Sequence, residues 1–248
     1  WFPQNVSDRF IIIITAFSYF IMVDRSEGQN VVIATRAING RFERKTPTMK
    51  DEIVRIIFNP FWVVPPTIFI EDKLQEIRAL PRYQLRHYFE QRNYEIWNSN
   101  FTRRLDPESI DWSYIDAETD HKIYIRQKPN YWNALGVVKF DLTNPYSIYL
   151  HDTNQRNLFS QPMRLLSSGC IRLENPLAIA EHLLRSTKWS RSLIDETVAK
   201  PGQIMSKDTE VALARPMPVF VISLTSQLTS DNVLRFTSDI YGQNEEIL

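Results

Sequence analysis

The sequence predicts a mainly β fold with α-helical insertions, an α+β chain of 248 residues. Short runs of β-branched and aromatic residues, separated by turn signals, fill residues 10–70 and return from residue 122 onwards. Between them, residues 71–92 are rich in helix formers and place their apolar residues at helical spacing. This order indicates a sandwich-like sheet that is interrupted by one inserted segment.

The first zone is expected to consist of strands. Residues 10–23 (FIIIITAFSYFIMV) are the most apolar run. We interpret this run as one buried strand, because it is shorter than the ~20 residues that cross a bilayer. Two further β-rich runs follow at 30–38 and 52–60. Residues 1–70 and 121–248 are predicted to form one domain.

The middle zone, residues 71–120, is predicted to be an inserted helical subdomain. Two helices are expected at 71–80 and 83–92, and Pro81 separates them because proline cannot continue a helix. The polar and aromatic stretch 97–116 has no clear period and is expected to be loop.

The last zone returns to strands and adds two helices. The first helix is expected at 176–185, with Asn175 as N-cap and Pro176 at the first helical position, and the second at 190–199. The expected strands of this zone are 122–127, 136–142, 146–152, 211–214, 219–225 and 233–236.

Composition excludes several classes of function. Lys and Arg together number 29, as do Asp and Glu, so the chain has no basic excess to meet nucleic-acid phosphates. The single cysteine, Cys170, cannot form an intramolecular disulfide or a multi-thiolate metal site. There is no phosphate-binding glycine loop, no dinucleotide pattern and no metal-ligand cluster, so no cofactor is expected.

The most informative stretch is Ser167-Ser168-Gly169-Cys170-Ile171-Arg172. A nucleophilic thiol needs exposure, a nearby base and donors for an oxyanion. The small residues before Cys170 allow a sharp turn, and Gly169 can adopt dihedrals closed to other residues. The N–H groups of Gly169 and Cys170 are then natural oxyanion donors. The alternative is a buried cysteine in an ordinary loop.

The candidate base is His151, in the stretch YSIYLHD. Alternation places Ser147, Tyr149 and His151 on one face of the expected strand. The ordinary imidazole pKa lies near ~6.5, which suits a base for a thiol. Asp152 is expected on the opposite face, so a backbone carbonyl is the better candidate to orient His151. A histidine without function at a strand end is the alternative.

Together these residues resemble the signature of the L,D-transpeptidases, bacterial enzymes that cross-link peptidoglycan through a cysteine. That signature is a strand-borne His, a loop, then Ser/Thr-x-Gly-Cys, an aliphatic residue and Arg or Asn. Here His151 and Cys170 are 19 positions apart and SSGCIR completes it. Many members carry His at the position of Ser168. The lack of that histidine is typical of a larger Gram-negative subgroup, which this sequence resembles. NGRFERKTPTM, FNPFWVVPPTI, IRQKPNYWNALGVVKF and PVFVISLT resemble further blocks of that subgroup.

The resemblance implies an L,D-transpeptidase-type β-sandwich catalytic domain, with residues 71–120 as a cap over the active site. It implies that Cys170 attacks a tetrapeptide stem, releases D-Ala and forms a thioester, which a diaminopimelate amine resolves to a 3→3 cross-link. The alternatives are an L,D-carboxypeptidase, an enzyme that attaches a protein to the wall, or a non-catalytic peptidoglycan-binding scaffold. Carbapenems are expected as covalent inhibitors. The periplasm is the expected location, with a membrane anchor or wall-binding domain possible outside this chain.

Four residues complete the candidate site as substrate-binding groups. Tyr149 shares the face of His151 and could contact the substrate, or it could pack at a sheet edge. Arg172 could bind a carboxylate with its planar fork, or it could brace the cysteine loop. Trp62 could line a cleft beneath the cap, or it could be a core residue. Ser168 lies two positions before the nucleophile.

Overall fold

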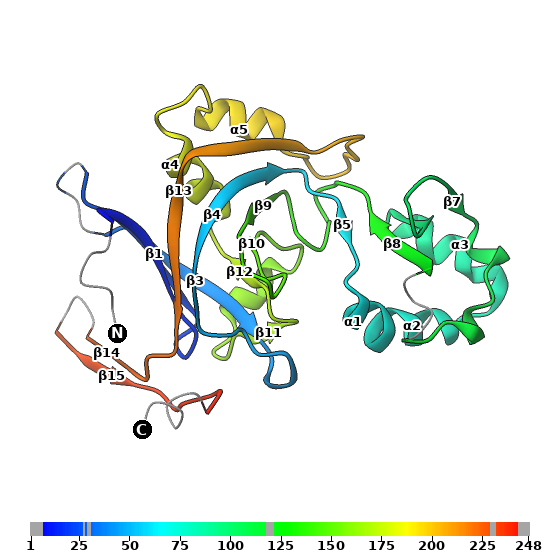
Figure 1. Cartoon of the computed structure of the whole chain (residues 1–248), viewed down its shortest axis with the longest axis horizontal. Coiled ribbons are helices and arrows are strands. Elements are labelled where there is room, and N and C mark those ends of the chain that lie inside the picture. Colours follow the sequence, from blue (N-terminus) through cyan, green and yellow to red (C-terminus); the bar gives the residue numbers. More distant parts are fainter. Residues whose placement is uncertain (1–6, 27, 29–30, 118–121, 229–231, 243–248) are drawn as a thin grey trace. The chain divides into compact units, whose positions relative to one another are not determined.

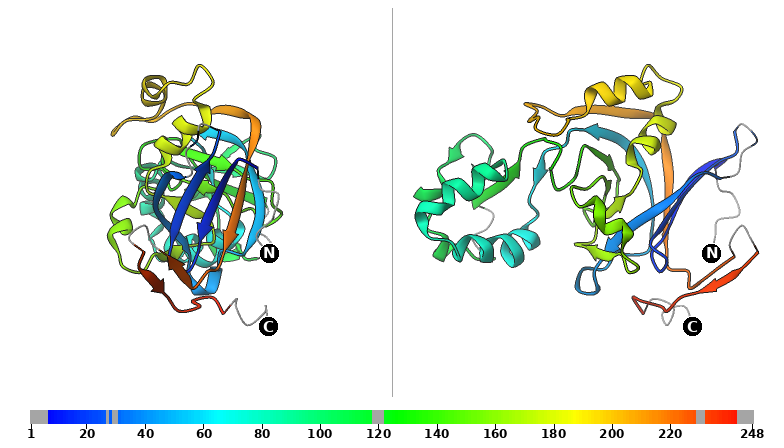
Figure 2. Two further views of the ribbon diagram at one scale, coloured as in Figure 1. Left: turned by 90° about the vertical axis from the view of Figure 1, so that its left-hand side faces the viewer. Right: turned by 180° about the vertical axis from the view of Figure 1, so that it is seen from behind.

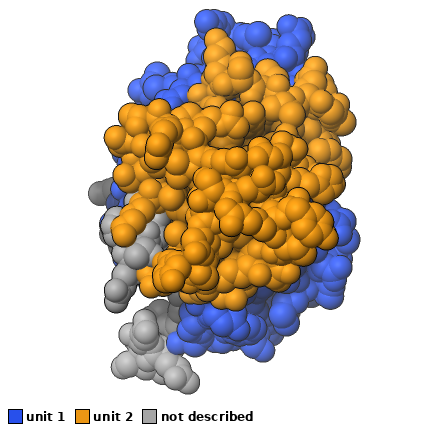
Figure 3. Space-filling view, turned by 90° about the vertical axis from the view of Figure 1, so that its right-hand side faces the viewer, with its two compact units in different colours: residues 1–58, 138–198, 209–248 blue, residues 59–137, 199–208 orange. Residues whose placement is uncertain are grey.

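The computed structural model of the chain is mainly β with a few helices, as predicted (Figure 1). It describes residues 7–26, 28, 31–117, 122–228 and 232–242. The chain divides into two compact units (Figure 3). Unit 1 consists of residues 1–58, 138–198 and 209–248, and unit 2 of residues 59–137 and 199–208. The predicted insertion 71–120 lies entirely within unit 2, and its role as a cap stays a prediction.

Unit 1 is built on a nine-stranded sheet in the order β11-β3-β12-β10-β9-β4-β13-β1-β2. Its strands are β1 (Arg9–Ile14), β2 (Tyr19–Asp24), β3 (Val31–Gly40), β4 (Met49–Phe58), β9 (Val138–Asp141), β10 (Leu150–His151), β11 (Leu165–Ser167), β12 (Ile171–Leu173) and β13 (Thr209–Ile222). Figure 2 shows β4, β13, β1 and β2 side by side. An additional pairing of β2 with β3 closes the sheet on itself, so that the strands enclose a core.

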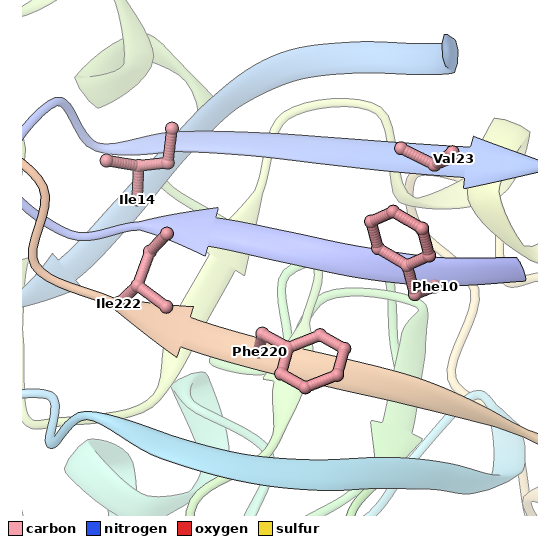
Figure 4. Close-up of a cluster of buried hydrophobic side chains, with 5 residues drawn as sticks. All are labelled: Phe10, Ile14, Val23, Phe220 and Ile222. Carbon is pink, nitrogen blue, oxygen red and sulfur yellow. The ribbon is translucent and has the colours of Figure 1, made fainter. Parts of the chain in front are cut away.

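The strand β1 and the last six residues of β13, 217–222, are buried on both faces. One face carries a cluster of Phe10, Ile14, Val23, Phe220 and Ile222 (Figure 4). The opposite face of β1 is also buried, at Ile11 and Ile13. A strand covered on both sides has no polar face, which explains the consecutive apolar residues 10–14 of β1.

The apolar run 10–23 is two strands, so the prediction of one strand was wrong. β1 and β2 form an antiparallel hairpin, in which Ile14 pairs with Tyr19. Thr15 and Ser18 make the turn: the Ser18 N–H donates to the Thr15 carbonyl at 3.1 Å, and Ser18 has a φ of 51°. Only these two hydroxyl side chains interrupt the run, and neither is a strong turn residue, so the turn was missed.

Unit 2 has a four-stranded sheet of its own, in the order β5-β8-β6-β7. Its elements are β5 (Trp62–Val63), α1 (Pro66–Ile68), α2 (Leu74–Arg78), α3 (Arg82–Gln91), β6 (Tyr94–Asn98), β7 (Arg104–Leu105) and β8 (Ile123–Gln127). The two predicted helices correspond to α2, extended backwards by a π-helical turn at Phe69–Lys73, and to α3. The stretch 97–116 is not loop throughout, because β6 ends and β7 lies within it.

Both helices predicted in the last zone are confirmed: they are α4 (Pro176–Leu184) and α5 (Arg191–Thr197). Ser190 caps α5, since its Oγ accepts from the Leu193 N–H. Residues 211–214 and 219–225 were predicted as separate strands, but β13 spans 14 residues and only shifts register between Ala212 and Met217. Pro216, which lies within that shift, lacks the N–H that a regular ladder needs. A separate hairpin of β14 (Ser226–Leu228) and β15 (Leu234–Phe236) follows.

Candidate active site

The strands β10 and β12 bring the cysteine and histidine segments together. They are parallel neighbours, with Leu150 opposite Ile171 and His151 opposite Arg172. The Ile171 N–H donates to the Tyr149 carbonyl at 3.1 Å. Cys170 therefore precedes β12 at the level where Tyr149 precedes β10. The two segments are far apart along the chain, and strand pairing alone places them side by side.

The strand that carries His151 is shorter than predicted. Only Leu150 and His151 are in strand, and Ser147 has a φ of 57° in an exposed turn, so the expected strand 146–152 was wrong. Asn144 explains the difference, because its side-chain oxygen accepts from the N–H groups of Tyr146 and Ile148 and curls the backbone.

Tyr149 and His151 nevertheless lie next to each other. Their rings meet edge to face with centroids 5.6 Å apart. The Ser147 carbonyl lies 3.8 Å from the Cys170 Sγ, so the segment before His151 passes directly beside the thiol. The aromatic ring and the imidazole thus belong to one side-chain layer around the cysteine.

His151 is buried and is held by a backbone carbonyl. Its Nδ1 is hydrogen-bonded to the carbonyl of Asp152, which makes Nδ1 the protonated nitrogen and Nε2 the basic one. The Asp152 carboxylate is bonded to Arg156 at 2.6 Å instead. Burial, and to a lesser extent the charge of Arg172, lower the pKa of His151 to about 3, although the bond to the Asp152 carbonyl opposes this shift.

The thiol of Cys170 is half-buried and is protonated in this environment. Burial raises its pKa, while hydrogen bonding from Tyr149 and the positive charges of Lys139 and Arg172 oppose that rise. With the imidazole pKa lowered as well, the structure favours a neutral thiol beside a neutral imidazole over a thiolate–imidazolium pair.

The turn before the cysteine is fixed by Ser167 and Gly169. Gly169 has a φ of 112°, a conformation that residues with a Cβ rarely adopt. Its N–H donates to the Ser167 Oγ at 3.1 Å, and that hydroxyl donates to the Cys170 carbonyl at 2.5 Å. The Gly169 N–H is therefore already bonded, and its role as an oxyanion donor stays a prediction. Ser168 accepts a hydrogen bond from the Arg44 side chain at 2.9 Å.

Two cations flank the thiol. Arg172 donates from Nη1 to the Gln155 side chain at 2.8 Å, and within the described residues its buried Nε has no hydrogen-bond partner. The Nζ of Lys139 lies 2.7 Å from Asp141 and 4.2 Å from the centre of the Tyr149 ring. Sequence reasoning missed Lys139, whose only signal was its place in a β-rich run.

Trp62 belongs to unit 2. It is buried there in β5, and its ring lies 6.3 Å from that of Tyr94. Its contact with a substrate stays a prediction.

The described part of the chain contains no group of three or more His, Cys, Asp or Glu side chains arranged to hold a metal ion. None of its described helices has the length and apolarity needed to span a bilayer.

Comparisons with known proteins identify the family of this chain. Residues 9–199 match the family model of the L,D-transpeptidase catalytic domain. A Haemophilus influenzae protein whose curated name assigns it provisionally to the L,D-transpeptidases is 33% identical over 218 residues, which cover 88% of this chain and 42% of the relative. The chain thus spans less than half the length of that relative.

Solved structures of L,D-transpeptidases are more distant in sequence. One from Mycobacterium smegmatis has 11% identity and a TM-score of 0.38, and the match covers 87% of this chain and 59% of the other. L,D-transpeptidase 1 from Mycobacterium tuberculosis has 11% identity and a TM-score of 0.34, over 87% and 62%. The match of the family model over most of the sequence shows that the chain belongs to the L,D-transpeptidase catalytic-domain family.

Proposed function

We propose that this chain is a cysteine L,D-transpeptidase that forms 3→3 peptidoglycan cross-links. The observation that supports it most is the parallel pairing of β10 with β12, which puts a buried histidine next to the segment of the only cysteine. Cys170 is the nucleophile and His151 is the general base. The substrate is a tetrapeptide stem, and the amine of a second stem is the acceptor.

The proton moves during the attack and not before it. Because both groups are neutral at rest, the His151 Nε2 takes the Cys170 proton as Sγ bonds to the carbonyl carbon. The carbonyl π electrons move to oxygen and form an oxyanion. When this collapses, the bond to the D-Ala nitrogen breaks, the imidazolium gives that nitrogen its proton, and D-Ala leaves a thioester.

The second half of the reaction reverses these roles. His151 takes a proton from the acceptor amine as its nitrogen attacks the thioester carbon. The C–S bond then breaks, an amide remains, and Cys170 recovers its proton. Water in place of the amine gives carboxypeptidase activity from the same intermediate.

The oxyanion is stabilised first by the Cys170 N–H. Gly169 contributes the backbone geometry that aims this group, since its own N–H is bonded to Ser167. Loss of one such donor typically costs ~2.7–4 kcal/mol of barrier. Tyr149 and Arg172 supply the contacts to the stem peptide. With peptidoglycan as the proposed substrate, we propose the periplasm as the location of the reaction.

Mass spectrometry tests the nucleophile. We expect one covalent carbapenem adduct on the intact chain and none on Cys170→Ala; an L,D-transpeptidase structure is described in complex with imipenem, which makes imipenem the natural probe. An adduct that persists in Cys170→Ala contradicts the assignment. No adduct on the intact chain favours the non-catalytic scaffold.

Product analysis tests the acceptor. Incubation with purified tetrapeptide stems that contain diaminopimelate should give a joined tripeptide–tetrapeptide product. Trimmed tripeptide alone, at every acceptor concentration, means an L,D-carboxypeptidase. A protein joined to the stem means wall attachment.

A further inference from the structure

One loop holds the cysteine turn at three consecutive residues. It consists of residues 40–46, connects β3 to β4, and is called here the bracing loop. The Arg41 N–H donates to the Ser167 carbonyl at 2.9 Å, and the Arg44 Nη1 donates to the Ser168 Oγ at 2.9 Å.

The third contact comes from the end of the bracing loop. Thr46 is fully buried, and its Oγ1 donates to the Gly169 carbonyl at 2.7 Å. The peptide that this contact fixes is the one whose N–H belongs to Cys170. Its orientation decides where that N–H points, because carbonyl and N–H lie in one rigid plane. Thr46 therefore sets the direction of the oxyanion donor.

The bracing loop is itself closed tightly at Gly40. The Gly40 N–H donates to the Thr46 Oγ1 at 2.8 Å, which orients the hydroxyl toward Gly169. A Cβ at Gly40 would lie 2.1 Å from the Arg44 carbonyl oxygen, so only glycine fits. Gly40 and Thr46 thus join the two ends of the loop through one hydroxyl.

A residue from the far end of the sequence holds this closure. Tyr241 is buried, at 4% exposed, although it follows the exposed β15 segment. Its hydroxyl donates to the Gly40 carbonyl, and its own carbonyl accepts from the Lys45 Nζ at 2.7 Å. Burial raises the pKa of Tyr241, so the phenol remains a donor at neutral pH.

We propose that Tyr241 is a positioning residue for the transpeptidase reaction: through Gly40 and Thr46 it fixes the peptide between Gly169 and Cys170, and with it the oxyanion donor. The inference rests on the proposed function, in which Cys170 is acylated. Tyr241 touches neither the thiol nor a substrate. It acts through two intervening residues, and it makes the C-terminal segment a part of the catalytic arrangement.

The test compares Tyr241→Phe with the unaltered chain, with Tyr19→Phe in β2 as the control. Acylation by imipenem needs the oxyanion donor, whereas alkylation by iodoacetamide needs only the thiolate. We expect Tyr241→Phe to slow acylation roughly five- to tenfold, the loss of about one hydrogen bond, and to leave alkylation unchanged or faster. Thr46→Val, which removes the hydroxyl and keeps the shape, should reproduce the effect if Tyr241→Phe folds poorly.

Hydrogen exchange gives a readout that does not depend on acylation. The backbone amides of residues 167–170 should exchange faster in Tyr241→Phe than in the unaltered chain, and their exchange rates should be unchanged in Tyr19→Phe. The rates are measured at a temperature well below the unfolding midpoint of either variant. Unchanged exchange in both Tyr241→Phe and Thr46→Val overturns the proposal. So does an equal fall in acylation and alkylation, since that indicates general destabilisation. Faster exchange in a chain that imipenem never acylates supports the positioning role and refutes the proposed function.

Discussion

His151 lies directly opposite Arg172 in the parallel pairing of β10 with β12. The guanidinium charge acts on both partners of the proton transfer: it lowers the pKa of His151, and it opposes the rise that burial causes in the pKa of Cys170. One cation therefore disfavours the imidazolium and favours the thiolate. The pair rests neutral, and the histidine gains its proton only while the thiol attacks.

The neutral resting state predicts the pH dependence of alkylation. Because burial raises the pKa of Cys170, the rate of reaction with iodoacetamide should still increase above the ordinary thiol range of about 8.5. A thiolate–imidazolium pair would instead give a plateau beginning near neutral pH. Rates measured from pH 5 to 10 by intact mass distinguish the two, and a plateau below pH 7 contradicts the neutral pair.

The charge of Arg172 can be removed by Arg172→Gln. Without it, the pKa of Cys170 should rise further and the pKa of His151 should rise toward its ordinary value, because the charge lowers both. Alkylation at pH 8 should slow, and the imidazole signal in NMR should titrate at a higher pH. Arg191→Gln in α5 is the control, since Arg191 pairs with Asp195 on the surface. If the imidazole of His151 titrates at the same pH in Arg172→Gln and Arg191→Gln, the charge of Arg172 does not affect the pKa of His151.

The buried imidazole predicts a loss of stability on acidification. The pKa of His151 is about 3 in the folded protein against 6.5 for the ordinary group, so between these values the unfolded chain binds the extra proton. As the pH decreases through this window, the free energy of unfolding should decrease, by up to about 1.4 kcal/mol per pH unit from this residue.

The variant His151→Asn isolates that contribution. Its side-chain N–H₂ can still donate to the Asp152 carbonyl, but it does not titrate. Denaturant unfolding at pH 4, 5, 6 and 7 should show a shallower loss of stability than in the unaltered chain. If the free energy of unfolding depends on pH in the same way in both proteins, His151 is hydrated in solution and its pKa is not lowered by burial.

Asp51 is predicted to hold the segment before His151 in place. Its carboxylate accepts hydrogen bonds from the N–H and side chain of both Thr143 and Asn144, and from the Glu52 N–H. Asp51→Asn replaces one acceptor oxygen with an NH₂ group, which would face the N–H and side-chain donors of Thr143 or Asn144 in a buried position. We expect a loss of about 1–3 kcal/mol in unfolding free energy, measured by denaturant titration.

The neighbouring exposed Glu52 provides the matched control. Glu52→Gln removes the same charge at the next position and should change stability by less than about 0.5 kcal/mol. An equal effect of both substitutions would mean that charge alone matters and that the hydrogen bonds do not.

Sequence reasoning recovered the strand-rich class, the two helices α4 and α5, and the segments around Cys170 and His151, because these depend on local pattern and spacing. It failed where distant parts of the chain decide the structure. Residues 10–23 form a hairpin, and its second strand, β2, pairs with the distant β3 as well. The expected strand at 146–152 was shortened by Asn144, which bonds to the N–H groups of Tyr146 and Ile148 and is itself held by the distant Asp51.

The candidate site shows the same limit. The motif located the cysteine and the histidine, but no pattern indicated that the Gly169 N–H would be bonded to Ser167. Thr46 and Tyr241 carried no signal, since their importance arises from contacts across 123 and 201 positions. Residues that position a catalytic group through tertiary contacts leave no periodicity to detect.

The pairing of β2 with β3 affects how copies of this protein meet. An open sheet presents unpaired N–H and C=O groups along its outer strands, to which another chain can add a strand of its own. In unit 1 the described strands from β3 through β12 and β13 to β2 follow one another in a closed circuit. That circuit offers no such template, so among the described strands self-association by strand addition is left to β11, the outer strand of the nine-stranded sheet, and to the small sheets, of which the β14–β15 hairpin is one.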